Sequence, residues 1–141
     1  MNSGKNTTYL PKGSRLNNRY IIDKLLGSGG FGITYMAFDL MLNSNVAIKE
    51  FFVDKAMRRD TSKSLTISVA EEEAGKVMIE KSLANFMNEI RVMRSLQNVP
   101  YISHFRDSFS ENGTEYIVMN MLNGRTLSEY AANRTEAVRV M

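Results

Sequence analysis

Hydrophobic and polar residues alternate over short distances in the first third of the chain. Three runs combine β-branched and aromatic residues with polar neighbours, at residues 19–26, 33–40 and 46–52, and each predicts a strand. Asp23 and Lys24 interrupt the apolar residues of the first run. Because a strand buried on both faces would not tolerate this charged pair, we expect an antiparallel sheet with one face toward water.

A helical pattern follows in the middle of the chain. Within residues 81–96 (KSLANFMNEIRVMRSL), large apolar side chains recur every three or four positions, at Leu83, Phe86, Met87, Ile90, Met93 and Leu96. This spacing predicts an amphipathic helix. Residues 53–80, which precede it, are polar and charged, and we interpret them as an insertion between the third strand and the helix.

Two more strands are expected after the helix. Residues 102–109 and 115–121 alternate apolar and polar side chains, and Asn112-Gly113 lies between them. An Asn-Gly pair in this setting is typical of a tight β-hairpin. The order of three strands, a helix and a hairpin predicts an α+β domain with five antiparallel strands.

The two ends of the chain differ from this middle part. Residues 1–18 are rich in Asn, Ser, Gly, Lys and Thr and predict a flexible lead-in. Asn123-Gly124 breaks the pattern after the hairpin, and residues 126–132 predict the start of another helix. We therefore divide the chain into the lead-in, a domain over residues 19–122, and an exit segment over residues 123–141.

Composition excludes several classes of protein. The hydrophobic fraction of 43% and the charged fraction of 23% are typical of a globular chain. The net charge of +3 suits an anionic ligand and equally an ordinary surface, and no dense Lys/Arg run indicates nucleic acid as a partner. The absence of cysteine excludes disulfides and thiolate metal sites. Without a signal peptide or an apolar run of membrane length, we expect a cytoplasmic location, with any membrane anchor beyond residue 141.

The stretch between the first two strands is unusually rich in glycine. Gly27, Gly29 and Gly32 follow the GxGxxG spacing, and Gly30 adds a fourth glycine. One interpretation is a dinucleotide-binding fold with Glu50 as its acidic residue. A Walker-type loop would need Gly-Lys-Ser/Thr, which is missing, and a glycine-rich hairpin without any ligand is the third interpretation. The glycines alone do not decide between the first and the third.

A lysine and a glutamate add a second signal. Lys49 ends an apolar strand, where a buried ammonium without a partner would be costly. Glu89 lies between Phe86 and Met93 on a helical wheel and therefore borders the apolar face of the predicted helix. Each residue by itself is typical of an ordinary surface. The joint order of glycine hairpin, strand lysine and helix glutamate favours an ion pair.

These motifs together resemble a known family. LGSGGFGITY, VAIK and FMNEIRVMRSL look like the ATP-binding lobe of protein kinases. GGFGITY, VAIKEFF, the RRD of Arg58-Arg59-Asp60 and ENGTEYIVMNMLNGRTL are similar to bacterial Ser/Thr kinases of the eukaryotic-like type. The resemblance runs from about Leu10 to Tyr130. It implies a kinase small lobe, with a five-stranded antiparallel sheet packed on one major helix.

The resemblance also implies ATP as the ligand, with Mg²⁺ in the complete enzyme and no metal ligand in this chain. Lys49 would hold the α- and β-phosphates and Glu89 would orient it, so these two are the expected catalytic residues. Met119 falls at the gatekeeper position and residues 120–122 at the hinge. The expected ATP-binding residues are Leu26, Gly27, Ser28, Gly29, Gly30, Phe31, Gly32, Thr34, Ala47, Lys49, Met119, Asn120 and Met121.

The sequence departs from the family pattern at three places. Thr34 stands where valine is usual, which changes one apolar contact with the base. The stretch between Lys49 and Glu89 is longer than in most eukaryotic kinases. Residues 98–102 (NVPYI) replace the common His-Pro-Asn-Ile-Val, which leaves the turn after the helix open.

The motifs of the family's second lobe are missing from these 141 residues. No Asp-Phe-Gly is present, and the His104-Phe105-Arg106-Asp107 stretch only imitates the catalytic His-Arg-Asp. Its His and Arg are not adjacent, and it precedes the expected hinge. We therefore expect the nucleotide-binding half of a kinase, which transfers no phosphate by itself.

Partners and alternatives follow from the same resemblance. A complete kinase would act on a protein substrate, and the surface that faces its second lobe would favour self-association of this part. One alternative is a pseudokinase-like module that binds nucleotide or a partner without catalysis. The other is the dinucleotide-binding domain, which a helix directly after Gly32 would favour and a hairpin would exclude.

Overall fold

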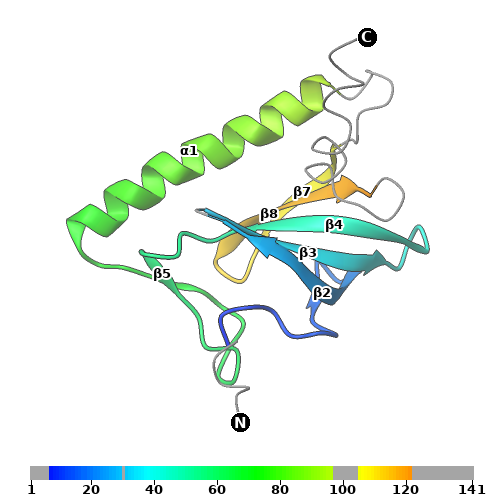
Figure 1. The fold of residues 1–141 in the computed structure, drawn as a ribbon, viewed down its shortest axis with the longest axis horizontal. Coiled ribbons are helices and arrows are strands. Elements are labelled where there is room, and N and C mark those ends of the chain that lie inside the picture. The colour runs from blue at the N-terminus through cyan, green and yellow to red at the C-terminus, as the bar shows by residue number, and fades with distance from the viewer. Residues whose placement is uncertain (1–6, 30, 97–104, 122–141) are drawn as a thin grey trace.

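The computed structural model describes residues 7–29, 31–96 and 105–121. Six strands of this part form one antiparallel sheet in the order β1-β2-β3-β4-β8-β7 (Figure 1). They are β1 (Arg15–Leu16), β2 (Tyr20–Ser28), β3 (Gly32–Asp39), β4 (Ser44–Phe51), β7 (Phe105–Glu111) and β8 (Thr114–Asn120). The predicted antiparallel sheet is confirmed. It has a sixth strand because the two residues of β1 pair with the start of β2.

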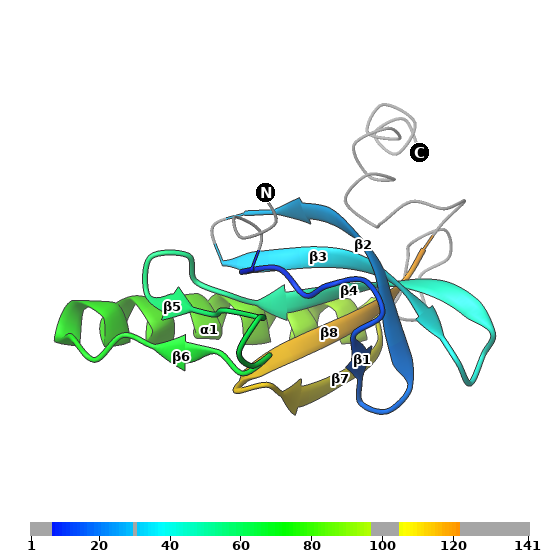
Figure 2. The same cartoon turned by 90° about the horizontal axis from the view of Figure 1, so that it is seen from below.

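The two faces of the sheet are covered by different segments. Helix α1 (Glu73–Ser95) lies on one face, and the described lead-in lies on the other together with the insertion that carries β5 (Met57–Arg58) and β6 (Ser68–Val69) (Figures 1 and 2). Side chains alternate between the faces along a strand. Lys49 of β4 therefore faces the side of α1, and its neighbour Glu50 faces the insertion.

The sheet curls so that its two edges approach each other. The Tyr20 hydroxyl of β2 donates to Asp107 of β7 at 2.8 Å, and the Asn17 amide donates to Glu111 at 2.7 Å. The Phe109 ring stacks between Tyr20 and Tyr116. The face opposite α1 thereby becomes an enclosed core, lined by the fully buried side chains of Leu16, Tyr20, Ile22, Tyr35, Ala37, Ile48, Tyr116 and Val118.

Helix α1 begins earlier than its apolar pattern predicts, at Glu73 instead of residue 81. Residues 73–85 include no buried side chain, and Ile79 and Leu83 pack only partly buried against the core, so the apolar pattern is weak in the first part of the helix. Phe86, Ile90 and Met93 are buried, whereas Met87 is 42% exposed, contrary to the prediction. Nowhere in the described residues is a helix both long and apolar enough to cross a bilayer.

The lead-in is better packed than its composition predicts. Within its described residues, Leu10 and Leu16 are buried, and the Leu10 amide donates to the Tyr35 hydroxyl at 3.1 Å. These two apolar side chains, together with backbone hydrogen bonds to the sheet and to the insertion, hold a polar segment in place. The exit segment over residues 123–141 and its expected helix lie outside the described residues.

The insertion also folds back onto the sheet. The Ile67 amide donates to the Asn112 carbonyl at 2.8 Å. Asn112 and Gly113 have φ of 55° and 76°, which is the tight turn that the Asn-Gly pair predicts. A Cβ on Gly113 would lie 3.1 Å from the Ile67 carbonyl oxygen, so this glycine lets the insertion approach the turn closely.

Candidate nucleotide-binding site

The glycine-rich stretch is a hairpin between β2 and β3. Strand β2 ends at Ser28 and β3 begins at Gly32, with the Gly29 amide donating to the Gly32 carbonyl at 2.9 Å. A strand directly after Gly32 excludes the dinucleotide-binding fold, which needs a helix there. A Cβ added at Gly27 or Gly29 would meet nothing within 4 Å, so packing within the protein does not require glycine at either position. Gly30 lies outside the described residues.

Gly32 has a different role, because the Lys49 side chain crosses it. A Cβ at Gly32 would lie 2.5 Å from the Lys49 Cε and 3.3 Å from its Cγ. These atoms belong to paired strands, since Thr34 of β3 lies opposite Lys49 of β4. The absence of a side chain at Gly32 is therefore what lets the lysine run under the hairpin.

Lys49 and Glu89 meet on this face. The Lys49 Nζ lies 3.0 Å from the Glu89 Oε1 and 3.4 Å from its Oε2, and 4.9 Å from the centre of the Phe31 ring. The side chains of the pair keep 20% and 35% exposure, so the ammonium remains accessible to an anion. Phe86, one turn before Glu89, packs on Phe51 with ring centres 5.3 Å apart and so seats α1 beside β4.

Further predicted site residues share the same face as Lys49. In the register, Thr34 lies opposite Lys49, and Ala47 lies opposite Met119. Ala47 and Met119 are buried, and Thr34 is half-buried. Strand β8 continues to Asn120, whose Oδ1 accepts from Arg106 at 2.7 Å.

The remaining predicted residues lie at the ends of these strands. Leu26 is half-buried at an irregularity of β2 between the paired Leu25 and Gly27, and Ser28 is exposed. Met121 packs partly buried against the core. The structure thus places five of the predicted residues on one face: Thr34, Ala47, Lys49, Glu89 and Met119. Leu26 and Ser28 lie at the edge of this group.

Comparison with known proteins identifies the family. A family model described as the protein kinase domain matches residues 20–139. The chain belongs to the protein kinase domain family.

Two relatives of this kinase domain are bacterial. It is 27% identical over 120 residues to the probable serine/threonine-protein kinase YbdM of Bacillus subtilis, covering 85% of this chain and 38% of YbdM. It is 30% identical over 118 residues to the serine/threonine-protein kinase PrkC of the same organism, covering 84% of this chain and 15% of PrkC.

The chain is also similar to a solved structure. The "PpkA-294 apo form" is 31% identical, with a TM-score of 0.72, and the match covers 92% of this chain and 44% of that one. The chain thus spans less than half the length of these relatives. The fold is that of a kinase small lobe.

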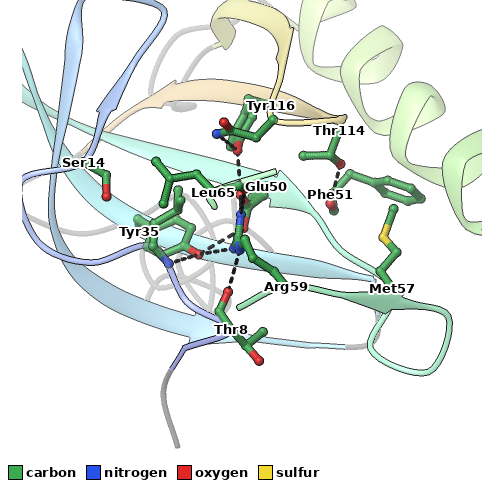
Figure 3. Close-up of polar contacts among 12 residues, drawn as sticks. Thr8, Ser14, Tyr35, Glu50, Phe51, Met57, Arg59, Leu65, Thr114 and Tyr116 are labelled. Carbon is green, nitrogen blue, oxygen red and sulfur yellow. Dashed lines mark hydrogen bonds and ion pairs between the residues drawn. The ribbon is translucent and has the colours of Figure 1, made fainter. Parts of the chain in front are cut away.

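A buried ion pair in this kinase domain was not foreseen from the sequence. Arg59 of the insertion donates from Nη2 and Nη1 to the two Glu50 oxygens, at 2.7 Å each, and neither side chain is exposed (Figure 3). The hydroxyls of Tyr35 and Tyr116 also donate to Glu50, at 3.0 Å and 2.6 Å. Glu50 therefore anchors the insertion and is not the ribose ligand of a dinucleotide fold. The one sequence signal was the Arg-Arg-Asp of the insertion, and an isolated charge pattern is typical of a solvated surface.

Burial shifts the proton affinities of this cluster. Desolvation raises the pKa of Tyr35 and of Tyr116 well above the usual tyrosine value, and the charge of Glu50 adds to both shifts. Burial is the largest single effect on the pKa of Arg59 and lowers it, but the hydrogen bonds to Glu50 and the attraction to its charge together outweigh burial, so the pKa lies above its ordinary value. Both tyrosines therefore remain neutral donors, and Arg59 remains charged, at neutral pH.

A second buried carboxylate holds the far end of the β3–β4 hairpin. Asp39 is fully buried and accepts two hydrogen bonds of 2.9 Å from Arg19, with further bonds from the amides of Met41 and Leu42. The hydrogen bond from Arg19 holds the pKa of Asp39 below its usual value. This pair lies at the opposite end of β3 from Gly32.

The imitation of a His-Arg-Asp motif belongs to the sheet. Arg106 and Asp107 lie in β7, where Arg106 donates to Asn120 and Asp107 accepts from Tyr20. His104 lies outside the described residues. These contacts agree with rejecting the stretch as a catalytic loop.

Proposed function

We propose that this kinase domain binds ATP as the small lobe of a Ser/Thr protein kinase. The observation that carries the proposal is the Lys49–Glu89 ion pair beneath a glycine hairpin. An accessible ammonium steadied by a carboxylate is what kinases use to hold the α- and β-phosphates of ATP. The formed pair also argues against the pseudokinase-like alternative.

The residues present fit ATP. Gly27 and Gly29 have no neighbour within 4 Å of an added Cβ, so the space beside the backbone there can receive a phosphate chain. The register places Thr34 and Met119 on the same face of the sheet as the small Ala47, and this is the face that would receive a flat base in the proposal. The proposed ATP-binding residues are Leu26, Gly27, Ser28, Gly29, Gly30, Phe31, Gly32, Thr34, Ala47, Lys49, Met119, Asn120 and Met121, with Glu89 orienting Lys49.

The activity belongs to a longer protein in this proposal. Bound Mg-ATP would supply the phosphoryl group that the complete kinase transfers to Ser or Thr of a protein substrate. The 141 residues contain no Asp-Phe-Gly and no adjacent His-Arg-Asp. We therefore expect this chain alone to bind the nucleotide weakly and to transfer no phosphate.

An NMR titration of the ¹⁵N-labelled chain with Mg-ATP tests the binding. We expect shifts in the amides of the glycine hairpin and β4, with an affinity weaker than micromolar because part of the kinase cleft is formed by the larger lobe. Lys49→Met should abolish these shifts. Lys12→Met, which removes a cation whose side chain is 80% exposed, is the matched control and should leave them unchanged. Unchanged spectra on addition of ATP would refute the proposal, and micromolar or tighter binding by calorimetry would refute the expected weakness.

A further inference from the structure

Arg59 is held more firmly than any surface cation would be. Besides its two bonds to Glu50, its Nε donates to the Thr8 carbonyl at 2.8 Å, and its Nη2 donates to the Tyr35 hydroxyl at 3.4 Å (Figure 3). Its guanidinium lies 5.7 Å from the centre of the Phe52 ring. Burying such a pair contributes little net stability compared with an apolar pair of the same volume. What the pair provides is one fixed position for the insertion.

A series of contacts connects this fixed part of the insertion to the start of α1. Arg59 directly follows β5, and β5 pairs with β6 through Met57 opposite Val69. The next residue, Ala70, donates its amide to the Ala56 carbonyl at 2.8 Å. A Cβ on Gly75 would lie only 2.7 Å from the Ala70 Cβ, so the first turn of α1 packs directly on this corner.

The first half of α1 is only partly covered by the rest of the domain. Residues 73–85 include no buried side chain, although Ile79 and Leu83 pack partly buried against the core, and the buried contacts of the helix begin at Phe86. Glu89 lies one turn after Phe86. The orientation of the helix before Glu89 therefore depends on the corner around Ala70 together with these partly buried contacts.

Lys49 lies next to the Glu50–Arg59 ion pair in the sequence of β4. It is the neighbour of Glu50 on β4, with its side chain on the opposite face. The Glu50–Arg59 pair thus links the strand that carries Lys49 to the corner on which α1 begins. Resting on the proposed function, we infer that Arg59 is a positioning residue that holds α1 in the orientation in which Glu89 pairs with Lys49.

Distance measurements between spin labels test this inference directly. The chain has no cysteine, so cysteines introduced at two exposed positions can be labelled uniquely. One label replaces Lys24 on β2, and the other replaces Lys76 or Asn88 on α1. We expect one narrow distance distribution for each pair in the parent chain. Arg59→Met should broaden both distributions, and the 24–76 pair more than the 24–88 pair.

A matched control separates positioning from general stability. Arg19→Met also removes a cation from a fully buried carboxylate, but at the far end of the β3–β4 hairpin. It should lower stability and leave both distance distributions narrow. If folded Arg59→Met protein keeps the parent distributions, or if Arg19→Met broadens them equally, the inference is wrong. Arg59→Lys, which keeps the charge and loses the paired hydrogen bonds, gives the same test if Arg59→Met does not fold.

Nucleotide binding gives an independent measurement. The affinity for Mg-ATP should fall about twofold to tenfold in Arg59→Met, in proportion to the fraction of molecules with the pair formed. An unchanged affinity despite broadened distances would overturn the inference. A parent chain that binds no ATP would refute the proposed function, and the spin-label distances would still decide the role of Arg59.

Discussion

Neutralising Glu50 is expected to be among the most destabilising single changes in this domain. The carboxylate accepts four hydrogen bonds, two from Arg59 and one each from Tyr35 and Tyr116. Glu50→Gln keeps the shape but leaves the guanidinium of Arg59 buried without a counter-charge. Breaking a buried pair in this way costs about 3–5 kcal/mol. Domains are typically stable by about 5–15 kcal/mol, so the loss is a large fraction of the total.

Urea unfolding followed by far-UV circular dichroism measures this cost, since the chain has no tryptophan for fluorescence. With a slope of about 1–3 kcal/mol per molar urea, a loss of about 3–5 kcal/mol should lower the midpoint by roughly 1–5 M. Lys12→Met is the control, because the Lys12–Asp23 pair is exposed, and it should change stability by less than about 1 kcal/mol.

A double variant tests the cause of the loss. Glu50→Leu combined with Arg59→Met removes both charges and should be more stable than Glu50→Gln, because no unpaired charge remains in the core. A cost below about 1 kcal/mol for Glu50→Gln would refute the reasoning. A double variant less stable than Glu50→Gln would do the same.

Three further predictions concern the hairpins and the surface. Gly32→Ala should displace Lys49 and weaken Mg-ATP binding. The free energy of unfolding should change by less than about 1 kcal/mol, because the added methyl group meets a flexible side chain. A large loss of stability in urea unfolding would contradict this. Asp39→Asn should cost about 1–3 kcal/mol at pH 7. Because folding lowers the pKa of Asp39, its stabilisation is present above its unfolded value near about 4 and is lost as the pH falls below it, so urea unfolding at pH 3 should show a smaller difference. An equal difference at both pH values would argue against the ion pair with Arg19. The chain should self-associate at high concentration through exposed apolar side chains, and a monodisperse monomer in light scattering would count against this.

Much of the fold could be predicted because local patterns encode it. The strands around Gly27 and Gly32 and the turn at Asn112-Gly113 follow from alternation and from residues that accept positive φ. The pairing of Lys49 with Glu89 could be predicted because one lies at the end of an apolar strand and the other borders an apolar helix face. The roles of these residues toward ATP remain predictions from the family resemblance.

Other features could not be predicted because nothing local marks them. The first two turns of α1 carry only a weak apolar pattern, since they contact the domain through a close approach at Gly75 and a partly buried Ile79, and not through a fully buried face. The lead-in was predicted to be flexible because its buried apolar side chains are few, Leu10 and Leu16, and much of what holds it is backbone hydrogen bonding, such as that of the Thr8 carbonyl. From the sequence alone, Arg59 would be predicted to lie at the surface, because a charged residue in a polar segment is usually exposed to water.

The sequence by itself determined the order of strands and helix, the glycine hairpin and the lysine–glutamate pair, because periodicity and turn chemistry act over a few residues. Only the tertiary structure decided which charges are buried. Glu50 and Arg59 lie in segments of opposite local character, and the curled sheet with the insertion folded across it is what removes both from water. That burial depends on contacts with Thr8, Tyr35 and Tyr116, which are distant in the chain and adjacent only in the folded domain.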